Sequence, residues 1–314
     1  MRPRYALALH GGAGVIERAT MTRDVEKAYR AGLSAALAAG HQVLAAGGSS
    51  LDAVVATVSA LEDDPQFNAG RGAVFTADGT IELDAAVMDG ATLAAGAVTG
   101  VTTAKNPVQL ARLVMQRTPH VMLAGAGAEA LAREHGLAVV KPAYFHTERR
   151  WNALQRVKQA AQISRPVAVT EADKHGTVGA VALDAAGNLA AATSTGGRNN
   201  KRAGRVGDSP VIGAGTFACN ATAAISCTGD GEYFLRAVAA HTVSALMEMK
   251  GWSIARAADH VIRKRLLPLG GTGGLIAIDR RGNIAMPFST PGMYRGHLRA
   301  DGEPVVMIYQ DEPT

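Results

Sequence analysis

Two short apolar stretches, each interrupted by a glycine-asparagine pair, constrain the fold of this chain more than any other feature. The first covers residues 177–197 with its turn at 185–188, and the second covers residues 274–285 with its turn at 282–283. Apolar runs on both sides of such a turn predict β-hairpins. Their strands are rich in small residues and almost free of charge, which is typical of sheets covered on both faces. The sequence therefore predicts that 177–197 forms a buried central pair of strands.

Helical and extended patterns surround these hairpins. Apolar periodicity predicts helices at 22–44, 50–61, 107–116, 126–134, 232–249 and 253–266, the second one capped by Ser49 or Ser50. Further strands are predicted at 5–9, 73–76, 80–83 and 95–101. Strands in the middle of the chain with helices grouped on either side favour a two-sheet core covered by helices.

Composition excludes several classes of protein. The 314 residues contain no long linker between independent units, so one large domain or two are expected. There is no run of about 18 apolar residues and no signal-peptide core, which argues against a membrane protein. The net charge of +5 is scattered and aromatic residues make up 4%, which argues against a nucleic-acid partner. We expect Cys219 and Cys227 to be reduced thiols in a cytoplasmic protein.

Thr177 stands at the start of the first predicted hairpin, in the stretch His-Gly-Thr-Val-Gly-Ala. A threonine hydroxyl needs a base, and a free α-amine with a pKa of about 7.7–8.0 can serve. That amine would exist only after cleavage behind Gly176. Thr195 ends the neighbouring strand, so the two hydroxyls are expected to meet at one strand end. Residues 158–174 lose periodicity, which predicts a loose segment before the bond between Gly176 and Thr177. The alternative to cleavage there is that the Gly-Thr pair merely opens an ordinary strand.

Three other clusters carry possible chemistry. In 204–210, Arg205 could grip a carboxylate and Asp208 an ammonium group, although the two could equally pair with each other in a surface turn. The stretch 226–232 links a strand to a helix and could supply donors to an oxyanion, or be a plain tight connection. The stretch 61–72 could offer carbonyls to a hard cation such as sodium, or simply end a helix.

Taken together, the ordered motifs are more specific than any one of them. They are His-Gly-Gly-Ala-Gly (10–14), Phe-Asn-Ala-Gly-Arg-Gly (67–72), Glu-Leu-Asp-Ala-Ala-Val-Met-Asp-Gly (82–90), Asn-Pro-Val (106–108), Pro-His-Val-Met-Leu (119–123), His-Gly-Thr-Val-Gly-Ala-Val-Ala-Leu-Asp (175–184), Ala-Thr-Ser-Thr-Gly-Gly (192–197), Gly-Arg-Val-Gly-Asp-Ser-Pro (204–210) and Ser-Cys-Thr-Gly-Asp-Gly-Glu (226–232). In this order they strongly resemble the plant-type (type III) L-asparaginase/isoaspartyl peptidase family of N-terminal-nucleophile hydrolases. The resemblance covers nearly the whole chain and weakens before Gly176.

This resemblance implies an α+β fold, a four-layer αββα sandwich made as a single domain of residues 1–314. It also implies self-cleavage between Gly176 and Thr177 into an α subunit, 1–176, and a β subunit, 177–314. Two such pairs would form a dimer of heterodimers. No organic cofactor is expected.

The resemblance further implies roles for individual residues. The catalytic group would be the nucleophile Thr177, its supporting hydroxyl Thr195, and an oxyanion hole of Thr228 and the Gly229 backbone. Substrate contacts would come from Arg205 to the α-carboxylate, Asp208 to the α-ammonium, Gly229, Gly231 and, from the α subunit, Asn68. A structural sodium ion would be held by the backbone carbonyls of Leu61, Glu62, Asp64, Phe67, Ala69 and Arg71.

The expected reaction is hydrolysis of β-aspartyl dipeptides and of the side-chain amide of L-asparagine, with L-aspartate as the common product. Three alternatives stay open. A glycosylasparaginase would use the same nucleophile on a sugar-bearing amide, and a threonine aspartase-like protease would act on proteins. From a different class, the glycine-rich turns could belong to a non-hydrolytic nucleotide-binding protein, although no complete G-x-x-x-x-G-K-[ST] or G-x-G-x-x-G motif is present.

Overall fold

The computed structural model describes residues 5–162, 176–300 and 302–312. Its helices run over α1 (Arg23–Ala45), α2 (Ser50–Asp63), α3 (Pro107–Arg117), α4 (Gly125–Glu134), α5 (Glu148–Gln162), α6 (Gly231–Ala237), α7 (Ala239–Lys250) and α8 (Ile254–His260). The strands are β1 (Ala6–Gly14), β2 (Leu83–Asp89), β3 (Ala95–Val101), β4 (Met122–Ala124), β5 (Val178–Leu183), β6 (Leu189–Thr195), β7 (Thr216–Ala218), β8 (Ala223–Gly229), β9 (Gly273–Asp279), β10 (Ile284–Ala285), β11 (Gly292–Arg299) and β12 (Val305–Tyr309).

The strands form two stacked sheets. The larger has the order β12-β11-β1-β5-β6-β2-β3-β4, and the smaller has the order β10-β9-β8-β7. Both predicted hairpins are present, since β5 pairs antiparallel with β6 and β9 with β10. Every residue of β5 and β6 is buried, as their uncharged sequences require.

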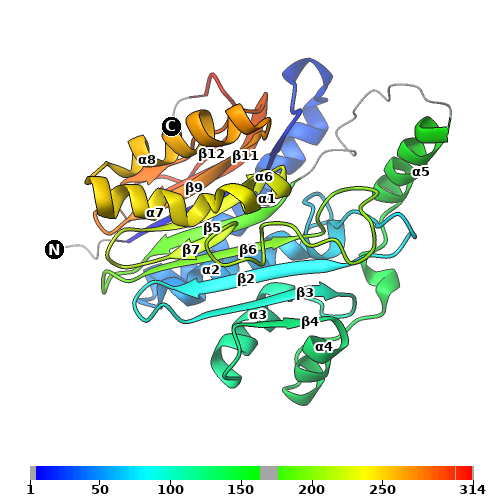
Figure 1. The fold of residues 1–314 in the computed structure, drawn as a ribbon, viewed down its shortest axis with the longest axis horizontal. Helices are drawn as coiled ribbons and strands as arrows, with labels where there is room; N and C mark the ends of the chain where they lie inside the picture. Colours follow the sequence, from blue (N-terminus) through cyan, green and yellow to red (C-terminus); the bar gives the residue numbers. More distant parts are fainter. Residues whose placement is uncertain (1–4, 163–175, 301, 313–314) are drawn as a thin grey trace.

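Three hydrophobic cores separate four layers. One core lies between helices α1 to α4 and the large sheet, a second lies between the two sheets, and a third lies between the small sheet and helices α6 to α8. Figure 1 shows α7 and α8 on the side of β9, and α2 behind β2, β5 and β6. The predicted αββα sandwich is confirmed.

The cap predicted at Ser49 or Ser50 is Ser49, and the first long helix is capped by Thr22, which was predicted as its first residue. The side chain of Thr22 accepts a hydrogen bond from the N–H of Val25, and that of Ser49 accepts one from Asp52. Both cysteines are free thiols, as expected. No helix among the described residues is long and apolar enough to span a bilayer.

Some predicted boundaries were wrong. No strand forms at 73–76 or 80–82, where the chain makes a turn with a single bridge at Thr76; Leu83, the last residue of the second predicted strand, is the first residue of β2. Helix α5 was missed, and it extends into the segment expected to be loose; residues 163–174 of that segment lie outside the described residues. The helix predicted at 232–249 is two helices, because Val238 between them takes a left-handed conformation with φ 47°.

Candidate active site

Thr177 directly precedes β5, at the centre of the large sheet, and is almost buried at 8% exposure. Its hydroxyl donates to the Thr195 hydroxyl at the end of β6, with 3.1 Å between the two oxygens. Thr195 Oγ1 also accepts the N–H of Gly197 at 2.9 Å. The predicted meeting of two hydroxyls at one strand end is confirmed. Because the Thr177 hydroxyl points its hydrogen at Thr195, the lone pairs of the Thr177 oxygen face away from Thr195.

A third hydroxyl lies on the other side of Thr177. Ser209 Oγ is 3.4 Å from Thr177 Oγ1 and is buried. Sequence reasoning quoted the stretch 204–210 that contains Ser209 but assigned it no role. The signal was therefore present, although only the fold brings this turn against the start of β5.

Thr228 lies near the end of β8 and faces the backbone of Thr177. Its hydroxyl oxygen accepts the N–H of Thr177 at 3.4 Å and that of Ala13 at 3.2 Å. Gly229 follows with φ +149°, and a Cβ there would lie 2.4 Å from the carbonyl oxygen of Thr272. The close pairing of β8 with β9 thus requires glycine and puts the Gly229 backbone at the wall of the cavity.

Arg205 and Asp208 meet at Gly231, the first residue of α6. A Cβ on Gly231 would lie 2.8 Å from Asp208 Oδ1 and 2.9 Å from Arg205 Nη2, so glycine leaves the space between them free. Arg205 donates through Nε and Nη2 to Glu232 at 3.0 and 2.9 Å. The alternative prediction, a surface turn in which Arg205 and Asp208 pair with each other, is therefore wrong.

Asp208 is an unusual carboxyl group. It is 4% exposed, and its Oδ2 has no hydrogen-bond partner among the described residues. Burial raises its pKa to about 7. A buried carboxylate without a partner is costly, so this position favours a ligand that brings a positive charge.

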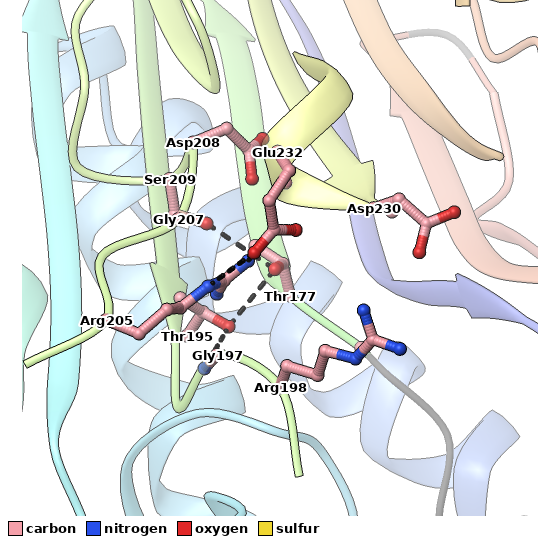
Figure 2. Close-up of a pocket in the computed structure, with 13 residues that line it drawn as sticks. Thr177, Thr195, Gly197, Arg198, Arg205, Gly207, Asp208, Ser209, Asp230 and Glu232 are labelled. Carbon is pink, nitrogen blue, oxygen red and sulfur yellow. Dashed lines mark hydrogen bonds and ion pairs between the residues drawn. The ribbon is translucent and has the colours of Figure 1, made fainter. Parts of the chain in front are cut away.

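One cavity gathers most of the predicted site (Figure 2). It is lined by Gly176, Thr177, Thr195, Gly197, Arg198, Arg205, Gly207, Asp208, Ser209, Gly229, Asp230, Gly231 and Glu232. Sequence reasoning missed Gly197, Arg198, Gly207, Ser209, Asp230 and Glu232 as lining residues. All except Arg198 belong to motifs that were quoted, and Arg198 directly follows one of them.

Asn68 lies behind the cavity rather than in its lining. Its Nδ2 donates to the carbonyl of Gly197 at 2.7 Å, and its Oδ1 accepts the N–H of Val74 at 2.9 Å. It thus fixes the turn that follows Thr195. Gly176 packs on Gly12, whose φ is +115° and whose missing Cβ would lie 2.5 Å from Gly176 Cα.

Beneath Thr177 lies a buried chain of polar side chains. His10 Nδ1 donates to the Thr177 carbonyl at 2.8 Å, and its Nε2 lies 2.9 Å from Ser226 Oγ, which is 2.7 Å from Thr193 Oγ1. Burial lowers the pKa of His10 to about 3, so the ring is neutral. Since the carbonyl only accepts, the proton sits on Nδ1 and Ser226 donates to Nε2. This chain fixes the backbone of Thr177. The whole stretch 10–14 belongs to β1 and does not open a helix, which removes the main support for a phosphate-binding turn.

The predicted cation loop fits a carbonyl-ligated ion. A Cβ on Gly70 would lie 2.4 Å from the Glu62 carbonyl oxygen, and one on Gly72 would lie 2.0 Å from that of Phe67, so these glycines make room for inward-turned carbonyls. The Glu62 side chain points toward α3, since its Oε1 accepts the Val108 N–H at 3.0 Å. Burial raises the pKa of this carboxyl group to about 8. Of the other predicted carbonyl donors, Leu61 lies in the last turn of α2, Asp64 and Ala69 lie in the connection that follows, and Arg71 lies in the turn at 70–72.

Comparison with known proteins shows the family to which this chain belongs. The model of a family described as Asparaginase matches residues 3–308. The chain belongs to that family, and it is a hydrolase. It is 53% identical over 312 residues to the isoaspartyl peptidase of Escherichia coli, a match that covers 98% of this chain and 97% of the relative.

More distant relatives carry similar names. The probable isoaspartyl peptidase/L-asparaginase 2 of Arabidopsis thaliana is 40% identical over 98% of this chain and 99% of its own length. The isoaspartyl peptidase/L-asparaginase of Mus musculus is 42% identical over 91% of this chain and 86% of its own length. The resemblance inferred from the ordered motifs is confirmed.

Proposed function

We propose that this protein is a self-processing threonine hydrolase that cleaves β-aspartyl dipeptides and the side-chain amide of L-asparagine. One observation carries the proposal: the Thr177 hydroxyl and the pair Arg205 and Asp208 line one cavity, so a nucleophile faces a site for two opposite charges. The names of the relatives, isoaspartyl peptidase and L-asparaginase, support the same substrates.

Self-cleavage would create the active form. Thr177 Oγ attacks the Gly176 carbonyl carbon, the peptide C–N bond breaks, and the acyl group passes to oxygen as an ester. Water then hydrolyses that ester and leaves Gly176 as a carboxylate and Thr177 with a free amine. Residues 1–176 and 177–314 become the α and β subunits. Glycine at 176 supports this step because it fits closely over Gly12.

The free amine then acts as the base for amide hydrolysis. It accepts the Thr177 hydroxyl proton while Oγ attacks the side-chain carbonyl of the substrate. Thr228 Oγ1 and the Gly229 N–H donate to the oxyanion, and the amine returns the proton to the leaving ammonia or amino acid. Water hydrolyses the acyl-threonine to release L-aspartate. Thr195 and Ser209 hold the hydroxyl oriented throughout.

Substrate selection would follow from paired charges. Beyond its contacts with Glu232, Arg205 would use Nη1 and the second N–H of Nη2 to fork onto the α-carboxylate. Asp208 would receive the α-ammonium and so gain the partner that its Oδ2 lacks. Asn68 would act from the α subunit by fixing the turn after Thr195, and Gly231 keeps the pocket open.

Two further features belong to this proposal. A sodium ion held by the carbonyls of Leu61, Glu62, Asp64, Phe67, Ala69 and Arg71 would stiffen the stretch 61–71, which contains Asn68. The mature enzyme would be a dimer of αβ heterodimers.

Thr177→Ala tests the central assignment. The variant should stay a single full-length chain on a denaturing gel and in intact-mass analysis, and should release no aspartate from β-Asp-Leu. Thr242→Ala, a change at a threonine on α7 remote from the cavity, is the matched control and should be cut normally. A Thr177→Ala chain that is cut after Gly176 would refute the nucleophile. Comparing β-Asp-Leu with a glycosylated asparagine on the wild-type enzyme separates the glycosylasparaginase alternative.

A further inference from the structure

Arg198 stands at the mouth of the cavity and has no role in the chemistry described so far. Its side chain is exposed, yet its backbone is fixed close to the nucleophile. The preceding Gly197 donates to Thr195 Oγ1 at 2.9 Å, and the Arg198 carbonyl accepts the N–H of Lys201 at 3.0 Å. Thr195 in turn holds the hydroxyl of Thr177. The base of Arg198 is therefore connected to the reacting group through only two hydrogen bonds.

Among the described residues that line the cavity, Arg198 is the arginine without an ion pair. Arg205 is bound to Glu232, and Asp230 Oδ2 accepts both the N–H and the hydroxyl of Thr272 at 3.0 and 2.9 Å. Among the described residues, no carboxylate lies within ion-pair distance of Arg198. A cation placed this way at the entrance of a site attracts an anionic group of the ligand.

The arrangement around Thr177 indicates which group that is. In the view of Figure 2, Arg205 and Asp208 lie on one side of Thr177, and Arg198 lies on the other. A substrate whose aspartyl end is held by Arg205 and Asp208 presents its scissile bond at Thr177. Its leaving group must then point to the side of Arg198. In a β-aspartyl dipeptide, the leaving residue carries its own α-carboxylate two bonds beyond the scissile nitrogen, whereas asparagine releases ammonia and has no such group.

We infer that Arg198 binds the α-carboxylate of the leaving amino acid and makes the enzyme favour dipeptides with a free C-terminus over asparagine. The inference rests on the proposed function and extends it to the leaving-group side of the same cavity. Guanidinium and carboxylate match in geometry, and a contact that stays solvated contributes about two- to fivefold in kcat/KM.

The test compares three substrates on wild-type enzyme and Arg198→Gln: β-Asp-Leu, its C-terminal amide, and L-asparagine. Wild type should prefer the acid to the amide by about two- to fivefold, and Arg198→Gln should abolish that preference. The ratio of kcat/KM for β-Asp-Leu to that for asparagine should fall by the same factor. Arg198→Lys should retain part of it, because the charge remains while the fork is lost.

Arg202→Gln is the matched control, since Arg202 is an exposed arginine of the same loop that does not line the cavity. It should leave all three substrates unchanged. The inference is overturned if wild type treats acid and amide alike, if Arg198→Gln slows all three substrates equally, or if Arg202→Gln gives the same loss. Wild-type protein that is inert on every substrate would instead overturn the proposed function itself, so the two failures are distinguishable.

Discussion

The unusual state of Asp208 leads to a pH dependence of ligand binding that can be worked out in advance. Its pKa of about 7 results from burial without a partner. An α-ammonium group can pair only with the ionised carboxylate. Lowering the pH from 8 to 6 reduces the ionised fraction from about nine-tenths to about one-tenth, so binding should weaken about tenfold.

The assay should report Asp208 and not the Thr177 amine. L-2-aminobutyrate has the α-ammonium and α-carboxylate of the substrate but no charge on its side chain, so it suits this purpose. Its inhibition constant against β-Asp-Leu hydrolysis should rise about tenfold between pH 8 and pH 6. In the isosteric variant Asp208→Asn, L-2-aminobutyrate should inhibit weakly, and its inhibition constant should be nearly independent of pH. If Asp208→Asn keeps the wild-type slope, the titrating group is another one and the reasoning fails.

The same group should affect stability with a definite sign. The folded pKa of Asp208 is raised above its ordinary value of 3.8, so the folded state holds the proton more tightly than the unfolded state. Its contribution to stability is therefore largest below pH 4 and is lost as the pH rises to about 7. The total is on the order of 4 kcal/mol, since each pKa unit corresponds to about 1.4 kcal/mol. The Tm of Asp208→Asn minus the Tm of wild type should accordingly be larger at pH 8 than at pH 5. If this difference is the same at both pH values, burial is not the origin of the raised pKa.

Two other predictions follow from the space around the site. Gly231→Ala puts a methyl group 2.8 Å from Asp208 Oδ1 and so displaces the charged pair, which should lower kcat/KM for β-Asp-Leu by about a hundredfold while self-cleavage continues. Gly127→Ala, whose new Cβ meets nothing within 4 Å, is the control. Near-normal activity of Gly231→Ala would show that the pocket is looser than described. Replacing sodium by tetramethylammonium at equal ionic strength should lower Tm by a few degrees if the carbonyls of the 61–71 connection bind the small cation, and identical melting curves would exclude that site.

The sequence predicted the parts of the fold that depend on local pattern. The hairpin 177–197 was recognisable because apolar runs flank a turn whose residues permit it, and its missing charges indicated cover on both faces. The break at Val238 was not recognisable. There, Ala240 and His241 donate their N–H groups to the carbonyls of Ala214 and Gly213, at 3.1 and 2.8 Å. These distant acceptors replace the helical ones and allow a β-branched residue to take φ 47° without any glycine or proline to signal it.

The candidate site divides in the same way. Thr177 and Thr195 could be placed together from the sequence, since a hairpin brings its two outer ends to one edge. Ser209 and Arg198 could not, because they lie in irregular turns whose position is set by distant contacts. Asn68 donates to the Gly197 carbonyl beside Arg198, and the Thr216 hydroxyl donates to the Ser209 carbonyl. Local pattern does not encode such contacts, so the lining of the cavity required the structure.

The position of the proposed scissile bond explains how a chain could be cut without losing its fold. In the ladders of β5, the first paired residues are Val178 with β6 and Gly179 with β1. The bond before Thr177 therefore lies just outside the sheet, and breaking it removes no ladder hydrogen bond. The two resulting chains would alternate within one sheet, with β1 and β2 from the first and β5 and β6 from the second. Buried strand pairing would then hold the subunits together, and the cut would change the chemistry of Thr177 while leaving the core that positions it intact.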